Sequence, residues 1–250
     1  MSIDIQSVSS SVAAITEQYE VITGNIANAS SAGYKRRLSV FSQALDAQMK
    51  TQAAGAAAGT SAAQAGSITE QTAIDFGQGS MQQTGNPFDM GLDGEGFFVV
   101  ETPQGELYTR HGQFALNAQG QLVDGSGRLV AGEGGPITVP PTVGHGSVSV
   151  SRDGSVFANG QSIGKLKTVA FADPQKLIPA GKQCFRAPAG VLPESASSCR
   201  VQQGYQEMSN VSVVEELVGL ITVTRLYEAN IKNLQVQDEM MKNLLGVASR

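Results

Sequence analysis

The sequence predicts an α+β protein in which N- and C-terminal helices form a coiled-coil-like inner domain and an antiparallel β domain is inserted between them. Three observations predict this fold class. Glycine is scarce at both ends and dense from Gly77 to Gly164, as in turn-rich β structure. Apolar residues recur at heptad spacing in both terminal segments. Short apolar runs separated by turn residues fill the middle.

The N-terminal segment carries an apolar residue at alternating steps of three and four, with mostly polar residues between them. So narrow a stripe is typical of a coiled-coil seam. We therefore predict a long helix whose stripe is an assembly interface; an ordinary intramolecular two-helix stalk is the alternative. The interface residues predicted here are Ile5, Val8, Val12, Ile15, Tyr19, Ile22 and Ile26.

The C-terminal segment repeats the pattern less regularly. Ser212 and Glu215 form an S-x-x-E capping box, which predicts a helix starting near Val213. Thr224 and Asp238 interrupt the stripe. The interface residues predicted here are Leu217, Leu220, Tyr227, Ile231, Leu234, Met241 and Leu245.

A second apolar row accompanies the first half of this helix, at Val214, Val218 and Ile221. A helix with two apolar rows needs more than one neighbour, because each exposed row would leave apolar surface in water. We therefore expect termini that become ordered only in a polymer.

These patterns predict three parts of the chain. Residues 1–36 and 205–250 form the helical polymerisation domain, residues 37–76 an extended connector, and residues 77–204 the β-rich outer domain. The connector is expected because Met49–Gly66 is dominated by small and polar residues without periodicity.

Short strands are predicted where apolar runs alternate with turn signals. The turn signals are Asn117–Gly120, Asp124-Gly125 and Asp153-Gly154. The expected strands are 97–100, 107–109, 113–116, 121–123, 148–150, 155–157 and 166–171.

Composition disfavours most kinds of ligand. The 250 residues carry a net charge of −5, so nucleic acid is not an expected partner. No apolar run is long enough for a membrane span, and the first residues lack the pattern of a cleaved signal peptide. We therefore expect no membrane insertion and no cleaved leader.

Candidate catalytic and metal-binding residues are few. His111 and His145, the two histidines, have no further ligand at metal-site spacing, and Gly91, Gly94 and Gly96 lack the strand-then-helix context of a nucleotide loop. The sequence thus predicts no enzyme, no cofactor and no metal. Cys184 and Cys199 are compatible with free thiols or with a disulfide.

Several separated motifs resemble one protein family. Residues 24–36 closely resemble the N-terminal signature of bacterial flagellar rod and hook proteins, and residues 209–230 resemble the other end of that family. Thr84–Pro87, Asp93–Phe98 and Tyr108–Phe114 resemble its middle part. The matching terminal residues are Asn25, Ala27, Asn28, Gly33, Tyr34, Lys35, Arg36, Asn210, Glu215, Arg225 and Asn230.

Within this family of axial proteins, the chain length and the stretch Gly132–Ile137 are most similar to the proximal rod class, with the distal rod class a close second. Hook proteins resemble the chain less, because they carry a larger outer insertion. The resemblance implies export through the flagellar type III apparatus. It also implies helical assembly with other rod subunits around a channel, in the part of the basal body that crosses the periplasm. A surface-binding β module on a helical stalk is the second hypothesis.

Two expectations concern the region that follows the first helix. Gly33 suits a helix C-terminus. The basic run Lys35–Arg37 is expected either to be a solvated helix end or to contact acidic residues such as Glu215 or Glu216 of an adjacent subunit.

Overall fold

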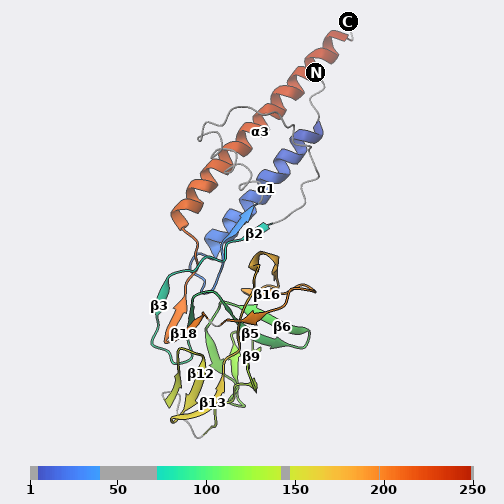
Figure 1. Cartoon of the computed structure of the whole chain (residues 1–250). Coiled ribbons are helices and arrows are strands. Elements are labelled where there is room, and N and C mark those ends of the chain that lie inside the picture. The colour runs from blue at the N-terminus through green and yellow to red at the C-terminus, as the bar shows by residue number, and fades with distance from the viewer. Residues whose placement is uncertain (1–4, 40–71, 142–146, 197, 249–250) are drawn as a thin grey trace, which may run out of the picture. The chain divides into compact units, whose positions relative to one another are not determined.

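The computed structural model describes residues 5–39, 72–141, 147–196 and 198–248, and side chains within the helices for residues 12–27 and for most of 213–239. The chain divides into two compact units (Figure 1). A helical unit comprises residues 1–27, 37–75 and 212–250, and a β unit comprises residues 28–36 and 76–211.

The helical unit contains two long helices and a small ribbon. Helix α1 spans Ile5–Ala27 and helix α3 spans Val213–Ala248. They lie side by side in opposite directions (Figure 1). Strands β1 (Arg37–Ser39) and β2 (Thr72–Ile74) pair antiparallel. Both predicted helices are confirmed, and α3 begins at the residue that the capping box predicts.

The β unit is built from short antiparallel strands. Its strands are β3 (Met81–Gln83), β4 (Met90–Asp93), β5 (Phe97–Thr102), β6 (Gly105–Thr109), β7 (Phe114–Leu116), β8 (Leu122–Asp124), β9 (Leu129–Gly132), β10 (Gly135–Pro136), β11 (Val148–Val150), β12 (Ser155–Ala158), β13 (Gln161–Lys165), β14 (Thr168–Ala170), β15 (Ile178–Pro179), β16 (Cys184–Arg186), β17 (Glu194–Ser195), β18 (Arg200–Gln203) and β19 (Tyr205–Glu207). A short 3₁₀ helix, η2, spans Pro174–Lys176.

Most of these strands belong to one ten-stranded sheet. Its main path runs β15-β16-β6-β5-β9-β8-β7, while β10 pairs with β9, and β14 pairs with both β5 and β17. Three smaller sheets complete the unit: β11-β12-β13, β18-β4 and β19-β3. The last two join strands far apart in the sequence, so the return of the chain before α3 closes the unit.

The hairpin turns follow from side chains that bond their own backbone. Asn117 accepts hydrogen bonds from the backbone N–H groups of Gln119 and Gln121, and Asp124 accepts them from Ser126 and Arg128. Asp153 accepts hydrogen bonds from the Ser151 and Ser155 hydroxyls, which lower its pKa to about 2. All three predicted turns are confirmed, because Asx side chains at these positions replace a backbone acceptor.

The core of the β unit is continuous. Along β5, the residues from Phe97 to Val100 are at most 3% exposed. Phe98 packs edge-to-face on Phe114, with ring centroids 5.1 Å apart. This core explains why the predicted strands from 97 to 116 form where the sequence places them.

The structure differs from three expectations drawn from the sequence. Residues 28–36 and 205–211 group with the β unit instead of the helical unit, because they hydrogen-bond to each other there. The two ends of the expected connector pair as β1 and β2, whereas Met49–Gly66 lies outside the described residues. Gly33 is not the helix terminus, since α1 ends at Ala27.

Gly33 has a different role. Its φ is +67°, and a Cβ there would lie 2.5 Å from the backbone nitrogen of His111. Its N–H donates to the carbonyl of Glu207 at 2.7 Å. Glycine is therefore required by left-handed backbone and by a close approach of two chain segments.

Gly112 is a second close-approach position, and it yields a stability prediction. A Cβ there would lie 1.7 Å from the Met90 carbonyl oxygen, in a backbone that cannot move aside cheaply. We expect Gly112→Ala to lower the free energy of unfolding by about 1 to 3 kcal/mol, as overpacking does. Gly125→Ala is the matched control, because a Cβ there meets nothing within 4 Å. Equal denaturation midpoints for the two variants would contradict this packing.

The two cysteines yield a second prediction. Cys184 and Cys199 are free, buried thiols in the core, and burial raises the pKa of each. The folded protein at pH 8 should therefore react slowly with a thiol reagent. Two thiols per chain should become labelled only after unfolding in denaturant. Rapid labelling of the folded chain would contradict the assignment of these cysteines as buried thiols. No labelling of the chain unfolded without reductant would contradict their assignment as free thiols.

Candidate assembly site

Helices α1 and α3 meet along a short apolar seam. Ile15, Ile22 and Val223 are buried there, with Ile26 and Leu220 packed beside them. A Cβ on Gly219 would lie 3.3 Å from the Cδ1 atom of Ile22. The missing side chain of Gly219 therefore lets the two helices approach closely.

The seam only partly follows the predicted stripe. On α1, Ile15 and Ile22 are buried and Val12 and Ile26 partly buried, but Tyr19 is 46% exposed. The predicted residues Ile5, Val8, Met241 and Leu245 lie outside the residues whose side chains are described.

On α3 the face toward α1 is displaced from the predicted row. Leu217 is 45% and Tyr227 42% exposed, whereas Val223 is 1% exposed. Leu220, Ile231 and Leu234 are partly buried, and Leu220 packs in the seam. Sequence reasoning missed Val223; its signal is the small residue one turn earlier, Gly219, which marks the face of closest approach.

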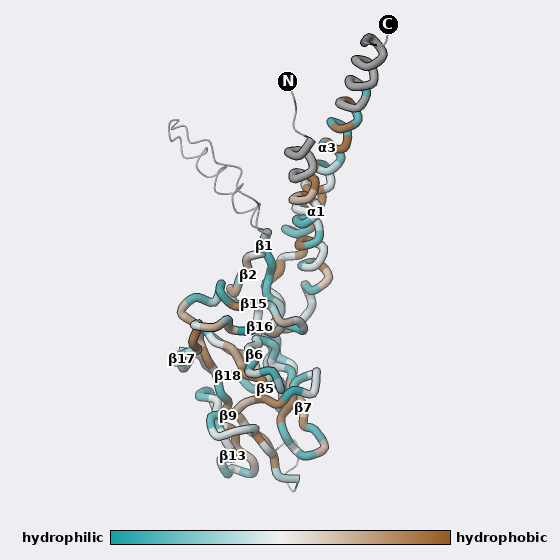
Figure 2. The backbone as a smooth tube through the Cα atoms, turned by 90° about the vertical axis from the view of Figure 1, so that its right-hand side faces the viewer, coloured by the Kyte–Doolittle hydropathy of each residue, from teal (hydrophilic) through white to brown (hydrophobic). Residues whose placement is uncertain are grey.

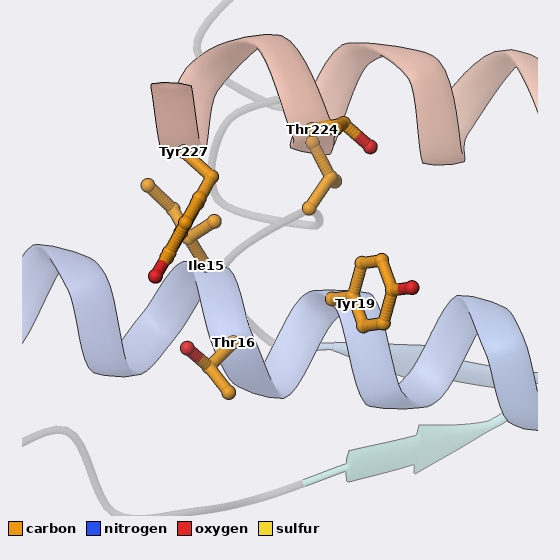
Figure 3. A pocket seen from close by; sticks show the side chains of 6 residues that line it. Ile15, Thr16, Tyr19, Thr224 and Tyr227 are labelled. Atoms are coloured by element: carbon orange, nitrogen blue, oxygen red, sulfur yellow. The ribbon is translucent and has the colours of Figure 1, made fainter. Parts of the chain in front are cut away.

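A pocket opens beside the seam, between the two helices (Figure 3). Its volume is about 260 Å³, and Ile15, Thr16 and Tyr19 of α1 face Val223, Thr224 and Tyr227 of α3. The Thr16 and Thr224 hydroxyls donate to the carbonyls of Val12 and Leu220 in their own helices. The walls are therefore apolar although two threonines line them.

The second apolar row of α3 is exposed. Val214 is 73%, Val218 60% and Ile221 55% exposed. Figure 2 shows hydrophobic and hydrophilic residues alternating along α3. The described part of the helical unit therefore leaves one row of α3 uncovered.

Two asparagines of the terminal motifs bind backbone instead of a ligand. The Asn25 side chain donates to the Arg37 carbonyl at 2.8 Å and accepts from the Arg37 N–H at 2.9 Å. The Asn210 side chain accepts from the Arg36 N–H at 2.7 Å and donates to the Gly77 carbonyl. Each asparagine thus satisfies backbone groups within its own unit, where an aliphatic residue would leave them unpaired.

Lys35 is the most buried member of the basic run. Its Nζ atom lies 2.7 Å from the Glu207 Oε1 atom and donates to the Gly77 carbonyl at 2.8 Å. Both side chains of the ion pair are completely buried. The expectation of a solvated basic run is therefore wrong for Lys35, and the buried pair leaves no room for it to contact a carboxylate of another subunit.

Arg110 completes this charged cluster. Its Nη1 atom lies 3.4 Å from the other carboxylate oxygen of Glu207, and its guanidinium lies 5.3 Å from the centre of the Phe97 ring. The Gly79 N–H also donates to Glu207. One carboxylate therefore pairs with two cations and a backbone N–H, and it joins three distant segments of the β unit.

The remaining motif residues have local roles. Ala27 is the last residue of α1, and Asn28 accepts hydrogen bonds from Ser31 in the following turn. The Tyr34 N–H donates to the Ser31 carbonyl. Asn230 donates to the Leu226 carbonyl one turn earlier. Glu215 and Arg225 are exposed on α3.

The described residues offer no arrangement for metal binding, since no three His, Cys, Asp or Glu side chains among them gather closely enough. None of the helices described there is long and apolar enough to cross a membrane. The helical unit instead presents exposed apolar side chains.

Comparison with known proteins identifies the family. Residues 91–158 match the flagellar hook protein FlgE/F/G D1 domain, and residues 202–247 match the flagellar basal body rod FlgEFG protein C-terminal domain. A basal-body rod protein FlgG from Buchnera aphidicola is 33% identical over 242 residues, covering 90% of this chain and 91% of the relative. The chain belongs to the flagellar basal-body rod protein family.

Other relatives agree. FlgG of Bacillus subtilis is 32% identical, with 91% of this chain and 92% of the relative covered. FlgF of Caulobacter vibrioides is 30% identical, with 92% and 91% covered. The matched C-terminal domain includes Glu207, Asn210 and nearly all of α3. The resemblance seen in the terminal motifs is confirmed.

The buried cluster yields a stability prediction. Glu207→Gln removes the carboxylate that the buried Lys35 and Arg110 both contact, so we expect it to lower the free energy of unfolding by about 3 to 5 kcal/mol. Denaturant melts followed by circular dichroism measure this.

The matched control is Glu133→Gln, which removes a carboxylate from an exposed ion pair with Lys165. Its denaturation midpoint should stay at the wild-type value, because solvent screens such pairs. A Glu207→Gln variant as stable as this control would contradict the role assigned to the cluster.

Proposed function

We propose that this chain is a non-enzymatic structural subunit of the flagellar basal-body rod, which assembles helically with neighbouring axial proteins. Its membership of the rod protein family supports the proposal. The FlgG and FlgF relatives are named flagellar basal-body rod proteins, and their alignments cover 90% and 92% of this chain.

One observation carries the assembly role. Among the described residues, eleven large apolar side chains are exposed, and nine of them belong to α1 and α3. The two in the β unit are Ile178 and Leu192. Apolar surface gathered on one pair of helices marks an interaction surface, whereas the β unit buries its own core.

The proposal places the terminal helices as a coiled-coil-like layer around the export channel, with the β unit outside. Helices packed on several neighbours resist bending and twisting, which transmission of torque requires. The export apparatus, as the route by which subunits reach the rod, is part of the proposal through the family resemblance.

The position along the rod also belongs to the proposal. The stretch Gly132–Ile137 favours the proximal class, with the distal class second. FlgG and FlgF relatives match at nearly equal identity, 33% and 30%.

The experiment places charge on the exposed helical surface. In the bacterium that encodes the chain, Val218→Asp with Ile221→Asp should abolish its incorporation into purified basal bodies and stop swimming, because a carboxylate cannot be buried unpaired. Immunoblots of basal bodies and soft-agar assays measure this.

Ile178→Asp in the β unit is the matched control, since Ile178 is 53% and Ile221 55% exposed. This control should swim normally. Basal bodies that never contain the wild-type protein, or full motility after deletion of its gene, would refute the proposed function.

A further inference from the structure

The exposed row of α3 lies opposite its seam with α1. At 100° per residue, Val214, Val218 and Ile221 are roughly 140° to 180° around the helix axis from the buried Val223. Because successive members are three and four residues apart, they form a continuous ridge. With Val223 facing α1, this ridge points away from α1.

The pocket beside the seam is a groove of complementary character. Ile15 and Val223 line it, and so do Tyr19 and Tyr227, which come from opposite helices; Figure 3 shows Tyr19 on α1 and Tyr227 on α3. An apolar cavity of about 150 Å³ takes up a benzene molecule, so a groove of about 260 Å³ has room for a branched aliphatic side chain. The Thr16 and Thr224 hydroxyls bond carbonyls of their own helices, so such a guest would leave neither threonine without a partner.

Ridge and groove are different surfaces on different sides of one helix. A contact between unlike surfaces of identical chains is heterologous, and it builds a ring when the rotation closes and an open helical series when it does not. A ridge that met another ridge would instead produce closed pairs. An open series of copies is what a rod requires.

We propose that the ridge of Val214, Val218 and Ile221 docks into the Tyr19–Tyr227 groove of a second copy of this chain. The proposal rests on the proposed rod function and names its contact surfaces. It assigns Val218 and Ile221 to the inserted surface, and Thr16 and Thr224 to the receiving one.

Charge at the edge of the two surfaces fits this docking. Arg225 continues the ridge one turn after Ile221 and is exposed. Glu20 is exposed on α1, one turn after Thr16 and adjacent to Tyr19. Docking brings a cation at the end of the ridge to an anion at the rim of the groove, and such complementarity fixes the register of a contact.

Cysteine cross-linking in isolated basal bodies tests the proposal. A chain carrying both Thr16→Cys and Val218→Cys should form disulfide-linked dimers, trimers and higher multimers on oxidation, since each copy presents one donor and one acceptor. Cells expressing the two single variants together should yield dimers and nothing larger. Each single variant alone should remain monomeric, as should the wild type, whose Cys184 and Cys199 are buried.

Ser126→Cys combined with Thr16→Cys is the matched control. Ser126 is exposed, but it belongs to the β unit and not to α3. It should give no multimers. Cross-linked dimers from Val218→Cys alone would show a ridge-to-ridge contact and overturn the proposal.

Charge exchange gives an independent measurement on the full chain. Arg225→Glu and Glu20→Arg should each lower the multimer yield roughly twofold to fivefold, as expected for an exposed ion pair, and the two together should restore it. Basal bodies that contain the double-cysteine variant without cross-links would overturn the docking and leave the rod function standing. If the purified chain formed multimers but was not found in basal bodies, the docking would stand and the rod function would be overturned.

Discussion

The Glu207 carboxylate is the interaction on which the β unit depends. It lies near the end of the last strand and binds Lys35 from the segment after α1, Arg110 from the segment after β6 and the backbone of Gly79. A buried carboxylate is stable only with such partners. The unit is therefore complete only when the chain has returned from the far end of the sequence.

This constraint separates two kinds of stability in one chain. The β unit has a continuous apolar core and a buried charged cluster of its own. The two helices share a seam with only three buried apolar side chains among the described residues. Helices of this kind are marginal alone, so contacts with neighbouring copies are the natural source of their remaining stability.

Local patterns predicted much of the fold. The capping box fixed the start of α3, and Asn117, Asp124 and Asp153 identified three hairpins, because each signal acts over a few residues. The family motifs were recognised, but the physical role of their residues was not. Asn25 binds the backbone of Arg37, 12 residues away, and Asn210 binds that of Arg36, 174 residues away, and no spacing rule reports such partners.

The charged cluster and the seam were beyond local reasoning. Lys35 and Glu207 are 172 residues apart, so neither position indicates the other in the sequence. On α3, apolar residues occupy so many faces that heptad counting selected Leu217, whereas the close approach at Gly219 turns Val223 toward α1. Which apolar row faces the partner helix is decided by packing, which periodicity alone does not encode.

The central claim is that the terminal helices are the assembling part of a rod subunit and the β unit is not. A cryo-electron microscopy map of purified basal bodies, with this chain located by labelling, tests it most directly. The account predicts that α1 and α3 lie in the innermost helical layer against neighbouring subunits, with the β unit outside. A map in which β units form the inner layer, or in which α1 and α3 contact no other subunit, would contradict it.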